Sequence, residues 1–149
     1  MATYNKFNIF TENLLVGYHN FSTSGGDTLK VMLTDVLPVN TNTVFANITD
    51  IAAGNGYTAG GTATTSNTLS TSGGTAKFVS TGPVFTASGG AIAQFRYAVL
   101  YQSVAANTVS GQPTKPLIAW WDYGSEVNLS TGETFTVSFD GTNGVFTVA

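Results

Sequence analysis

The sequence has no cysteine among its 149 residues, and only 9% of its residues are charged. The absence of cysteine excludes disulfides, thiol catalysis, iron–sulfur ligation and cysteine-based zinc sites. The five basic residues are scattered along the chain: Lys6, Lys30, Lys77, Arg96 and Lys115. Because a nucleic-acid groove needs clustered positive charge, the net charge of −3 argues against nucleic acid as a partner.

Long apolar runs are missing as well. No stretch approaches the roughly 18 apolar residues that a membrane helix needs, and residues 1–6 lack the charged and apolar regions of a secretion signal. We therefore expect synthesis in the cytoplasm and no membrane partner. A chain of this length and 42% hydrophobic content predicts one domain, residues 1–149, with its own core.

Hydroxyl and amide side chains supply most of the polarity that charge does not. Soluble proteins usually carry roughly 25% charged residues, so the low charge favours a surface that other subunits cover. A Thr- and Ser-rich β protein without partners is the alternative. From residue 62 to 74 the sequence is almost entirely Thr, Ser, Gly, Asn and Ala, which predicts an exposed loop or a weakly held edge strand.

Short segments with apolar residues at alternate positions predict strands. These segments are residues 28–34, 76–81, 83–87, 92–101, 116–122, 134–140 and 145–149. Residues 44–51 fit either a strand or one helical turn, and residues 105–114 form a polar loop. Asp140-Gly141 and Asn143-Gly144 predict a hairpin turn into the last strand. The pattern favours an all-β fold: a single-domain antiparallel β-sandwich or a jelly-roll-like barrel.

The segment 92–101 is the predicted central strand, with one face apolar and the other mixed. Phe95, Tyr97, Val99 and Tyr101 fall on one face, and Arg96, Ala98 and Leu100 on the other. Residues 117–121 are apolar on both faces, which predicts a strand that is covered on both sides. The glycines between residues 54 and 61 do not match a nucleotide-binding motif and predict unusual backbone angles or close approach.

Aromatic residues at spacings of three and four predict a short N-terminal helix over residues 6–19. The stripe consists of Phe7, Phe10, Leu14, Tyr18 and Phe21. Two strands joined near Glu12 and Asn13 are the competing interpretation, because aromatic residues also favour strands. In either case the segment 1–25 is expected to pack into the core or against a neighbouring subunit.

Few side chains could carry catalysis. His19 is the single histidine, and without a nucleophile motif it is expected to be a partly buried or subunit-facing imidazole. Asp122, Glu126 and Glu133 could supply the paired carboxylates of a glycoside hydrolase, but acidic residues at strand ends usually form turns. The Asp140–Gly144 turn lacks the later ligands of a calcium loop. We assign no catalytic, cofactor or metal residue and expect the protein not to be an enzyme.

Two further groups of side chains could bind a ligand or fix the sheet. Trp120 and Trp121 with Tyr123 could stack on a sugar, although alternation points one tryptophan to each face and predicts that one is core. A carbohydrate-binding platform would require at least one tryptophan ring largely exposed. Arg96 and Asp122 are expected to pair, and a buried pair would specify strand register more than stability.

Several segments are similar to segments of known proteins. In order along the chain they are YNKF (residues 4–7), DTLKVMLT (27–34), IAAGNGYTAGG (51–61), FRYAVLY (95–101), KPLIAWWDYG (115–124) and GETFTV (132–137). Through these segments the chain resembles a family of small structural proteins of tailed bacteriophages and prophages. The resemblance spans nearly the whole chain, but the Thr- and Ser-rich segment 62–74 departs from the family pattern. The resemblance implies a virion component that is made in the bacterial host and assembled onto the particle.

Within a virion, the expected role is a capsid decoration, or cement, protein bound to the major capsid protein, with a trimer at local three-fold axes. A tail, neck or baseplate position is the alternative within the virion. A carbohydrate-binding module for host surface glycans and a hydrolase are alternatives from other classes. We expect residues 2–10, 62–74 and 105–114 to contact partner subunits, through hydrogen bonds and apolar anchors rather than charge.

Overall fold

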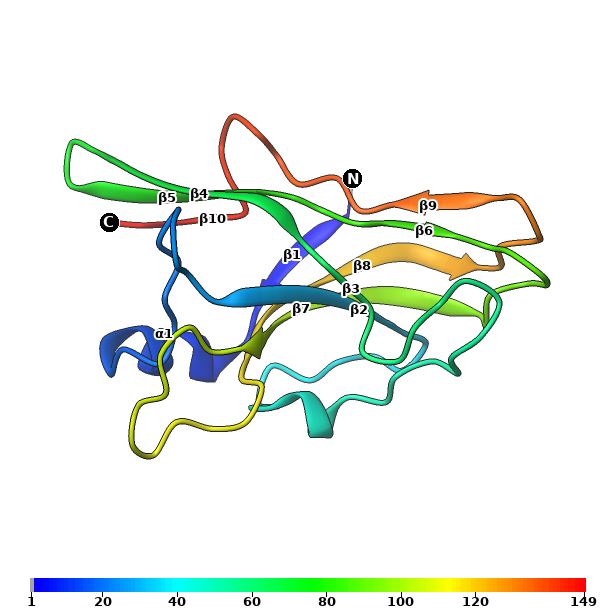
Figure 1. Cartoon of the computed structure of the whole chain (residues 1–149), viewed down its shortest axis with the longest axis horizontal. Coiled ribbons are helices and arrows are strands. Elements are labelled where there is room, and N and C mark those ends of the chain that lie inside the picture. Colours follow the sequence, from blue (N-terminus) through cyan, green and yellow to red (C-terminus); the bar gives the residue numbers. More distant parts are fainter. Residues whose placement is uncertain (1) are drawn as a thin grey trace.

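The computed structural model describes residues 2–149, which fold into two β layers with a layer of loops below them (Figure 1). The main layer is a five-stranded antiparallel sheet with the order β1-β8-β7-β2-β3. Its strands are β1 (Thr3–Lys6), β8 (Leu117–Val127), β7 (Phe95–Val104), β2 (Thr28–Thr34) and β3 (Thr62–Ala63).

The second layer is divided into two small antiparallel sheets. One has the order β10-β5-β4 and consists of β10 (Phe146–Val148), β5 (Thr75–Thr81) and β4 (Thr65–Ser72). The other pairs β6 (Val84–Thr86) with β9 (Thr134–Thr136). The predicted all-β antiparallel fold is confirmed. Within residues 2–149 the three sheets remain separate, which is the sandwich alternative rather than a closed barrel.

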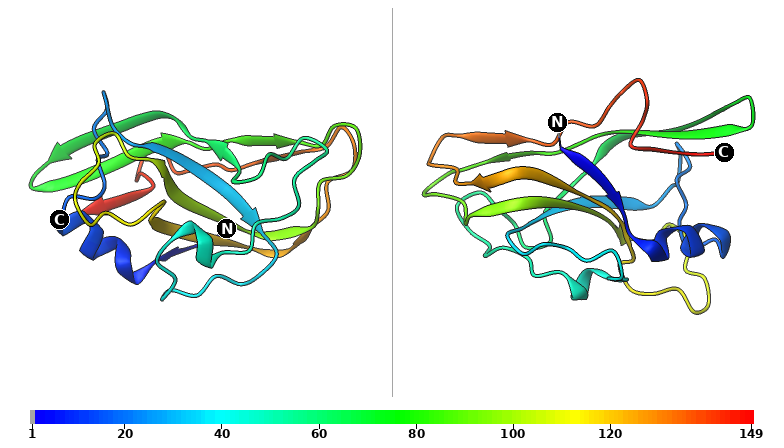
Figure 2. Two further views of the ribbon diagram at one scale, coloured as in Figure 1. Left: turned by 60° about the horizontal axis from the view of Figure 1, so that its bottom comes forward. Right: turned by 180° about the vertical axis from the view of Figure 1, so that it is seen from behind.

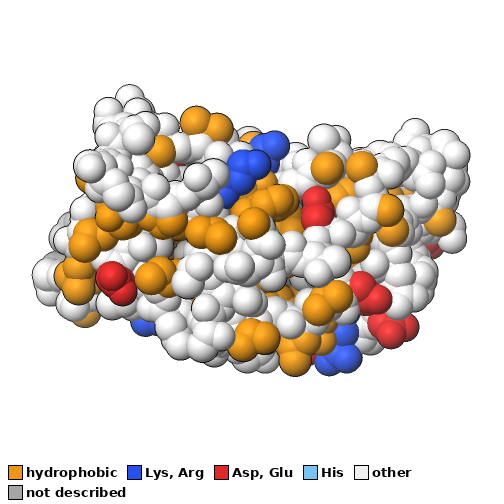
Figure 3. All heavy atoms as spheres, turned by 90° about the horizontal axis from the view of Figure 1, so that it is seen from below, with side chains coloured by type: hydrophobic (Ala, Val, Ile, Leu, Met, Phe, Trp, Pro, Cys, Tyr) orange, Lys and Arg blue, Asp and Glu red, His pale blue; other side chains and the backbone are white. Residues whose placement is uncertain are grey.

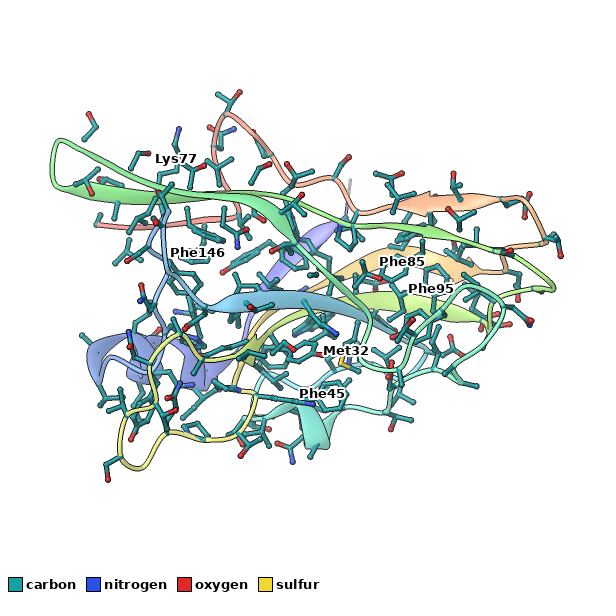
Figure 4. All side chains as sticks on the ribbon, in the orientation of Figure 1. Met32, Phe45, Lys77, Phe85, Phe95 and Phe146 are labelled. Carbon is teal, nitrogen blue, oxygen red and sulfur yellow. The ribbon has the colours of Figure 1, made fainter. Side chains whose placement is uncertain are left out.

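The core is divided by the main sheet. Phe85 and Phe95 lie between the two β layers, whereas Met32 and Phe45 lie below the main sheet (Figure 4). Both spaces are apolar because consecutive residues of β2 and β7 point to opposite faces and both faces are covered. The β8 segment from Leu117 to Trp120 is buried throughout, so the predicted two-sided cover is confirmed.

The N-terminal helix is shorter than the aromatic spacing predicted. The chain begins with β1, and helix α1 spans Asn8–Leu15 rather than residues 6–19. Gly17, with φ of +76°, follows the last turn and ends it in the left-handed conformation that glycine tolerates. The two-strand interpretation is therefore wrong. No helix in the described part of the chain is long and apolar enough to cross a membrane.

The aromatic stripe of this segment is core, but it does not face one way. Phe7 is fully buried below the main sheet, whereas Phe10 and Phe21 pack between the layers. Helix α1 sits at the end of the sheet, so residues on either side of its start reach opposite faces.

The central strand also departs from simple alternation. Tyr97, Val99 and Tyr101 pack below the sheet as predicted, but Phe95 packs above it. The β7–β8 ladder shifts register between Phe95 and Tyr97, and such a bulge turns the following side chains to the opposite face. The prediction for Phe95 was wrong for this reason.

The last third of the chain forms a crossover instead of the predicted hairpin. Strand β9 ends at Thr136 and pairs with β6, whereas β10 pairs with β5. Between them, the Asp140 carboxylate accepts hydrogen bonds from the backbone N–H groups of Thr142 and Asn143, both at 2.8 Å. This turn carries the chain from one small sheet to the other. Strand β8, in contrast, continues to Val127, beyond the predicted end at Asp122.

Residues 44–51 and the glycine-rich and hydroxyl-rich segments after them agree with the predictions. Residues 44–51 contain a single 3-10 turn, η1 (Phe45–Asn47). Gly61 has φ of +74°, and a Cβ there would lie 1.8 Å from the Val31 carbonyl oxygen, so close backbone approach requires glycine. Strand β4 is an exposed edge strand, joined to β5 through Gly73 and Gly74, both with positive φ.

Candidate functional site

The open side of the sandwich, between β8 and the chain that follows β9, holds the best-defined surface site. Arg96 and Asp122 form a bidentate ion pair there, with Nε–Oδ1 and Nη2–Oδ2 distances of 2.8 and 2.9 Å. The predicted pairing of these residues is confirmed. Their side chains are 37% and 27% exposed, so the pair borders solvent instead of filling the core.

The two charged groups stabilise each other in their ionised forms. Hydrogen bonding to Arg96 lowers the pKa of Asp122, and the same contact raises the pKa of Arg96. The backbone N–H of Gly124 also donates to Asp122 Oδ1 at 2.7 Å. The guanidinium carbon lies 5.4 Å from the centre of the Tyr97 ring, which further fixes its plane.

Aromatic rings from both layers form the walls beside this pair. The ring of Trp121 lies 5.2 Å from that of Phe139, and Tyr123 meets Phe135 edge-to-face at 5.5 Å. Tyr4 of β1 is the cross-strand partner of Trp121 and contacts it edge-to-face at 5.7 Å. The first two pairs join β8 to the segment after β9 and to β9 itself, and the third joins β8 to its neighbour β1.

Two adjoining hollows lie among these rings. One, of about 220 Å³, is lined by Arg96, Tyr123 and Phe135 together with the hydroxyl residues Thr136 and Ser138. The other, of about 230 Å³, is lined by Tyr4, Asp140 and the backbone near Gly144. They share four lining residues: Ala2, Trp121, Ser138 and Phe139.

The sequence identified only half of this site. Trp121, Tyr123, Arg96 and Asp122 were singled out, but the opposite wall was interpreted as the buried face of a strand. The alternation of Phe135, Val137 and Phe139 does predict one apolar side. It gives no indication that this side meets the tryptophan of another layer, because periodicity carries no information about pairing partners.

The tryptophans occupy opposite faces, as alternation predicted. Trp120 is buried, at 8% exposure, and its Nε1–H donates to Asn40 Oδ1 at 3.0 Å. Trp121 is partly buried. Neither tryptophan ring is largely exposed, because Tyr4 and Phe139 cover much of Trp121, so the tryptophan platform that the carbohydrate-binding alternative requires is not present. Tyr123, at 56%, is the exposed ring of the group.

His19 is buried between aromatic rings. It stacks on Phe21 at 5.5 Å and lies 5.4 Å from Phe10. Neither ring nitrogen has a hydrogen-bond partner among the described residues. Burial lowers the pKa of His19 to about 4, although the nearby Gln102 side chain acts in the opposite direction. This is the buried alternative of the sequence prediction.

The three acidic residues considered for hydrolysis were Asp122, Glu126 and Glu133. Within residues 2–149, no group of three or more His, Asp and Glu side chains could hold a metal ion. Glu133 accepts a hydrogen bond from the Ser130 backbone N–H at 2.7 Å, in keeping with a turn-forming role. Asp122 is engaged by Arg96, and Glu126 lies further along β8.

Two of the three segments expected to contact partners lie at one end of the molecule. The β4–β5 hairpin and the loop 105–114 both lie at the α1 end in opposite views (Figures 1 and 2). Both are tied to the segment 18–27: Leu69 N–H donates to Thr23 Oγ1, and Gln112 Nε2 donates to the Tyr18 carbonyl. The third segment, residues 2–10, runs from the sheet edge into α1.

Comparisons with known proteins give no relatives. No protein-family model, no curated protein and no solved structure matches the chain.

Proposed function

We propose that this chain is a non-enzymatic structural component of a tailed-phage virion, and that it decorates the capsid and reinforces its lattice. The sequence segments that resemble small virion proteins of tailed phages support the virion assignment. In this role the protein is made in the cytoplasm of the bacterial host and joins the particle later. Its partner is the major capsid protein, and a trimer at local three-fold axes reuses one patch three times.

The observation that carries the proposal is the exposed, uncharged edge strand β4. Soluble proteins usually protect such edges with charged side chains, because an open strand pairs readily with other chains. Here no charged residue occurs between Asp50 and Lys77, and β4 is polar only through hydroxyl and amide groups. An edge of this kind suits permanent pairing with a partner in an assembly.

Exposed apolar side chains also occur on the loop-covered side of the molecule, away from β4. Val36, Leu37 and Val39 belong to one short stretch and are each 55–56% exposed. Seen from below, charged side chains form separate spots among uncharged surface (Figure 3). An interface built from such groups depends on apolar burial and hydrogen bonds, so it should resist salt.

Imaging of purified particles from the phage or prophage that encodes the chain tests the position. Density for the chain is expected on the capsid lattice, around points where capsid subunits meet. Density confined to the tail, neck or baseplate would replace the decoration role with the alternative position in the virion. Absence from purified particles would contradict both.

A charge placed in the edge strand tests the surface. Thr71 is exposed on β4, and Thr71→Lys should abolish incorporation into particles, because lysine blocks edge pairing. Thr71→Ser is the matched control and should be incorporated normally. Bound wild-type protein should stay on particles washed with about 1 M salt, where the screening length is about 3 Å. Normal incorporation of Thr71→Lys, or release in the wash, would place the interface elsewhere.

A further inference from the structure

The two adjoining hollows at the open side of the sandwich together make an aromatic trough, with Trp121 and Phe139 between them. Trp121 and Phe139 line both of them and lie 5.2 Å apart, so the pair separates two adjacent binding positions. Each hollow, at about 220 or 230 Å³, is smaller than the roughly 300 Å³ at the lower end of drug-sized pockets. Each therefore suits one ring-sized group, and the trough suits two groups joined in a chain.

The walls combine flat apolar surfaces with hydrogen-bonding groups that suit hydroxyls. Tyr123 is 56% exposed and offers a ring at the mouth of the first hollow. Thr136 and Ser138 also line this hollow, on the segment that carries Phe135 and Phe139, and the guanidinium-bearing Arg96 lines it as well. An amphipathic ring with apolar C–H faces and hydroxyl edges uses both kinds of group at once.

At the first hollow, the ion pair disfavours a charged ligand. Arg96 uses Nε and Nη2 for Asp122, so the pair has no net charge, yet its remaining N–H groups and carboxylate lone pairs can still form hydrogen bonds. An anion finds the positive charge already neutralised, and a cation meets the guanidinium at the same wall. Neutral hydroxyl groups can accept hydrogen bonds from Arg96, which lines the first hollow, without displacing Asp122.

We infer that this trough binds a neutral oligosaccharide, with two consecutive pyranose rings seated on either side of the Trp121–Phe139 pair. Tyr123 stacks on the first ring, and Arg96, held in place by Asp122, donates hydrogen bonds to its hydroxyl groups. The inference stands independently of the virion proposal, because it rests on the geometry of the trough alone.

The test is a titration of the purified protein with neutral oligosaccharides of one to six glucose, galactose or N-acetylglucosamine units. Binding is followed by tryptophan fluorescence and by saturation-transfer NMR of the sugar. At least one neutral series is expected to bind, with the disaccharide clearly tighter than the monosaccharide. Tyr123→Ala should weaken binding about tenfold, the effect of losing roughly 1.4 kcal/mol of stacking. Tyr123→Phe keeps the ring and should bind like the wild type.

Leu37→Ala is the matched control, because Leu37 is 56% exposed like Tyr123 but lines neither hollow. It should leave binding unchanged. The inference would be overturned if no neutral series bound at concentrations up to about 10 mM, which are high enough to detect a Kd near 1 mM. It would also be overturned if Tyr123→Ala bound as tightly as the wild type, or if an oligogalacturonate of equal length bound more tightly than the neutral sugar. A dimer that buries Tyr123 in the free protein would also overturn it, by making the trough an interface between copies.

Discussion

The two faces of the main sheet are covered by different kinds of structure. Above it, strands of the second layer supply aromatic rings that pack into each other, as between Phe78 and Phe146 at 5.3 Å. Below it, loops are held by single hydrogen bonds from buried aromatic side chains. Tyr101 donates to the Gly60 carbonyl at 2.7 Å, and Trp120 donates to Asn40 at 3.0 Å.

The difference shows how a chain with few charges covers both sides of a sheet. Strands satisfy their own backbone groups, so the upper layer can be held by apolar burial alone. Loops leave backbone groups unpaired, and on the lower face the Tyr101 hydroxyl is the partner of one such carbonyl, while the Trp120 indole holds a loop through the Asn40 side chain. Stability on the upper face should therefore depend on side-chain volume, and on the lower face on individual polar atoms.

The largest expected effect is the loss of ring volume on the upper face. Phe85 is 1% exposed, whereas its neighbour Val84 is 53% exposed. Phe85→Ala should lower the free energy of unfolding by about 4 kcal/mol, the cost of lost burial plus a cavity. Val84→Ala is the control and should change it little. Urea unfolding followed by fluorescence measures both, and equal effects would show that the upper layer is not held by packing.

The next largest effect on stability should come from protonation of His19, which would place a charge on the upper face of the main sheet. The pKa of His19 is lowered to about 4 from an unfolded value of 6.5, so the folded state resists protonation. Stability is complete above pH 6.5 and falls as the pH drops toward 4, because the unfolded chain binds the proton first. Between pH 7.5 and 5 the loss should be about 2 kcal/mol.

His19→Leu removes the only histidine and should make stability nearly constant over that range. Its ring nitrogens have no partners among the described residues, so an apolar replacement leaves no new unpaired group. Unfolding measured at four or five pH values in both proteins gives the difference. An unchanged slope in His19→Leu would contradict the assignment of this pH dependence to His19.

Sequence periodicity predicted much of this architecture for a physical reason. Strands with one or two buried faces must place apolar residues at fixed intervals, so β2, β5 and β8 could be located and the Arg96–Asp122 pair could be expected. The exposure of the edge strand β4 could be predicted because its segment has few apolar side chains to bury. These features depend on the local pattern of each segment.

Features that depend on pairing could not be predicted in the same way. The bulge before Tyr97 and the early end of β9 arise from which strand lies alongside, and no local pattern encodes that partner. The aromatic trough has the same origin, since Trp121 and Phe139 come from segments that do not pair as strands. An alternating pattern gives the side of a strand, but the neighbour on that side comes from the fold.

A single polar atom on the lower face should have a smaller effect than the upper-face changes. Tyr101→Phe removes the hydroxyl that donates to the Gly60 carbonyl and leaves that buried acceptor without this bond. We expect a loss of about 1 kcal/mol in the free energy of unfolding, the usual net value of such a bond. Tyr123→Phe, at an exposed ring, is the control and should have no measurable effect. Faster amide exchange in residues 58–61 would locate the loss in the loop.

The smallest effect is expected at the open side, which belongs to neither face. Arg96→Gln removes the ion pair, but both partners are partly exposed, and such pairs contribute little because solvent screens them. The residual contribution has a defined pH dependence. Because Arg96 lowers the pKa of Asp122, that contribution is present above the ordinary value of 3.8 and is lost as the pH falls through the lower, folded value.

The measurement compares Arg96→Gln with its parent in a His19→Leu background, so that histidine protonation does not contribute. At pH 7 the variant should be slightly less stable, and the difference should disappear once the pH is below the lowered pKa of Asp122, because Asp122 is then protonated in both proteins. High salt should reduce the difference at pH 7 in the same way. A difference that is large, or that grows on acidification, would show that Arg96 stabilises the fold by packing rather than by its charge. The open side would then contribute to the free energy of unfolding as a third region beside the two faces.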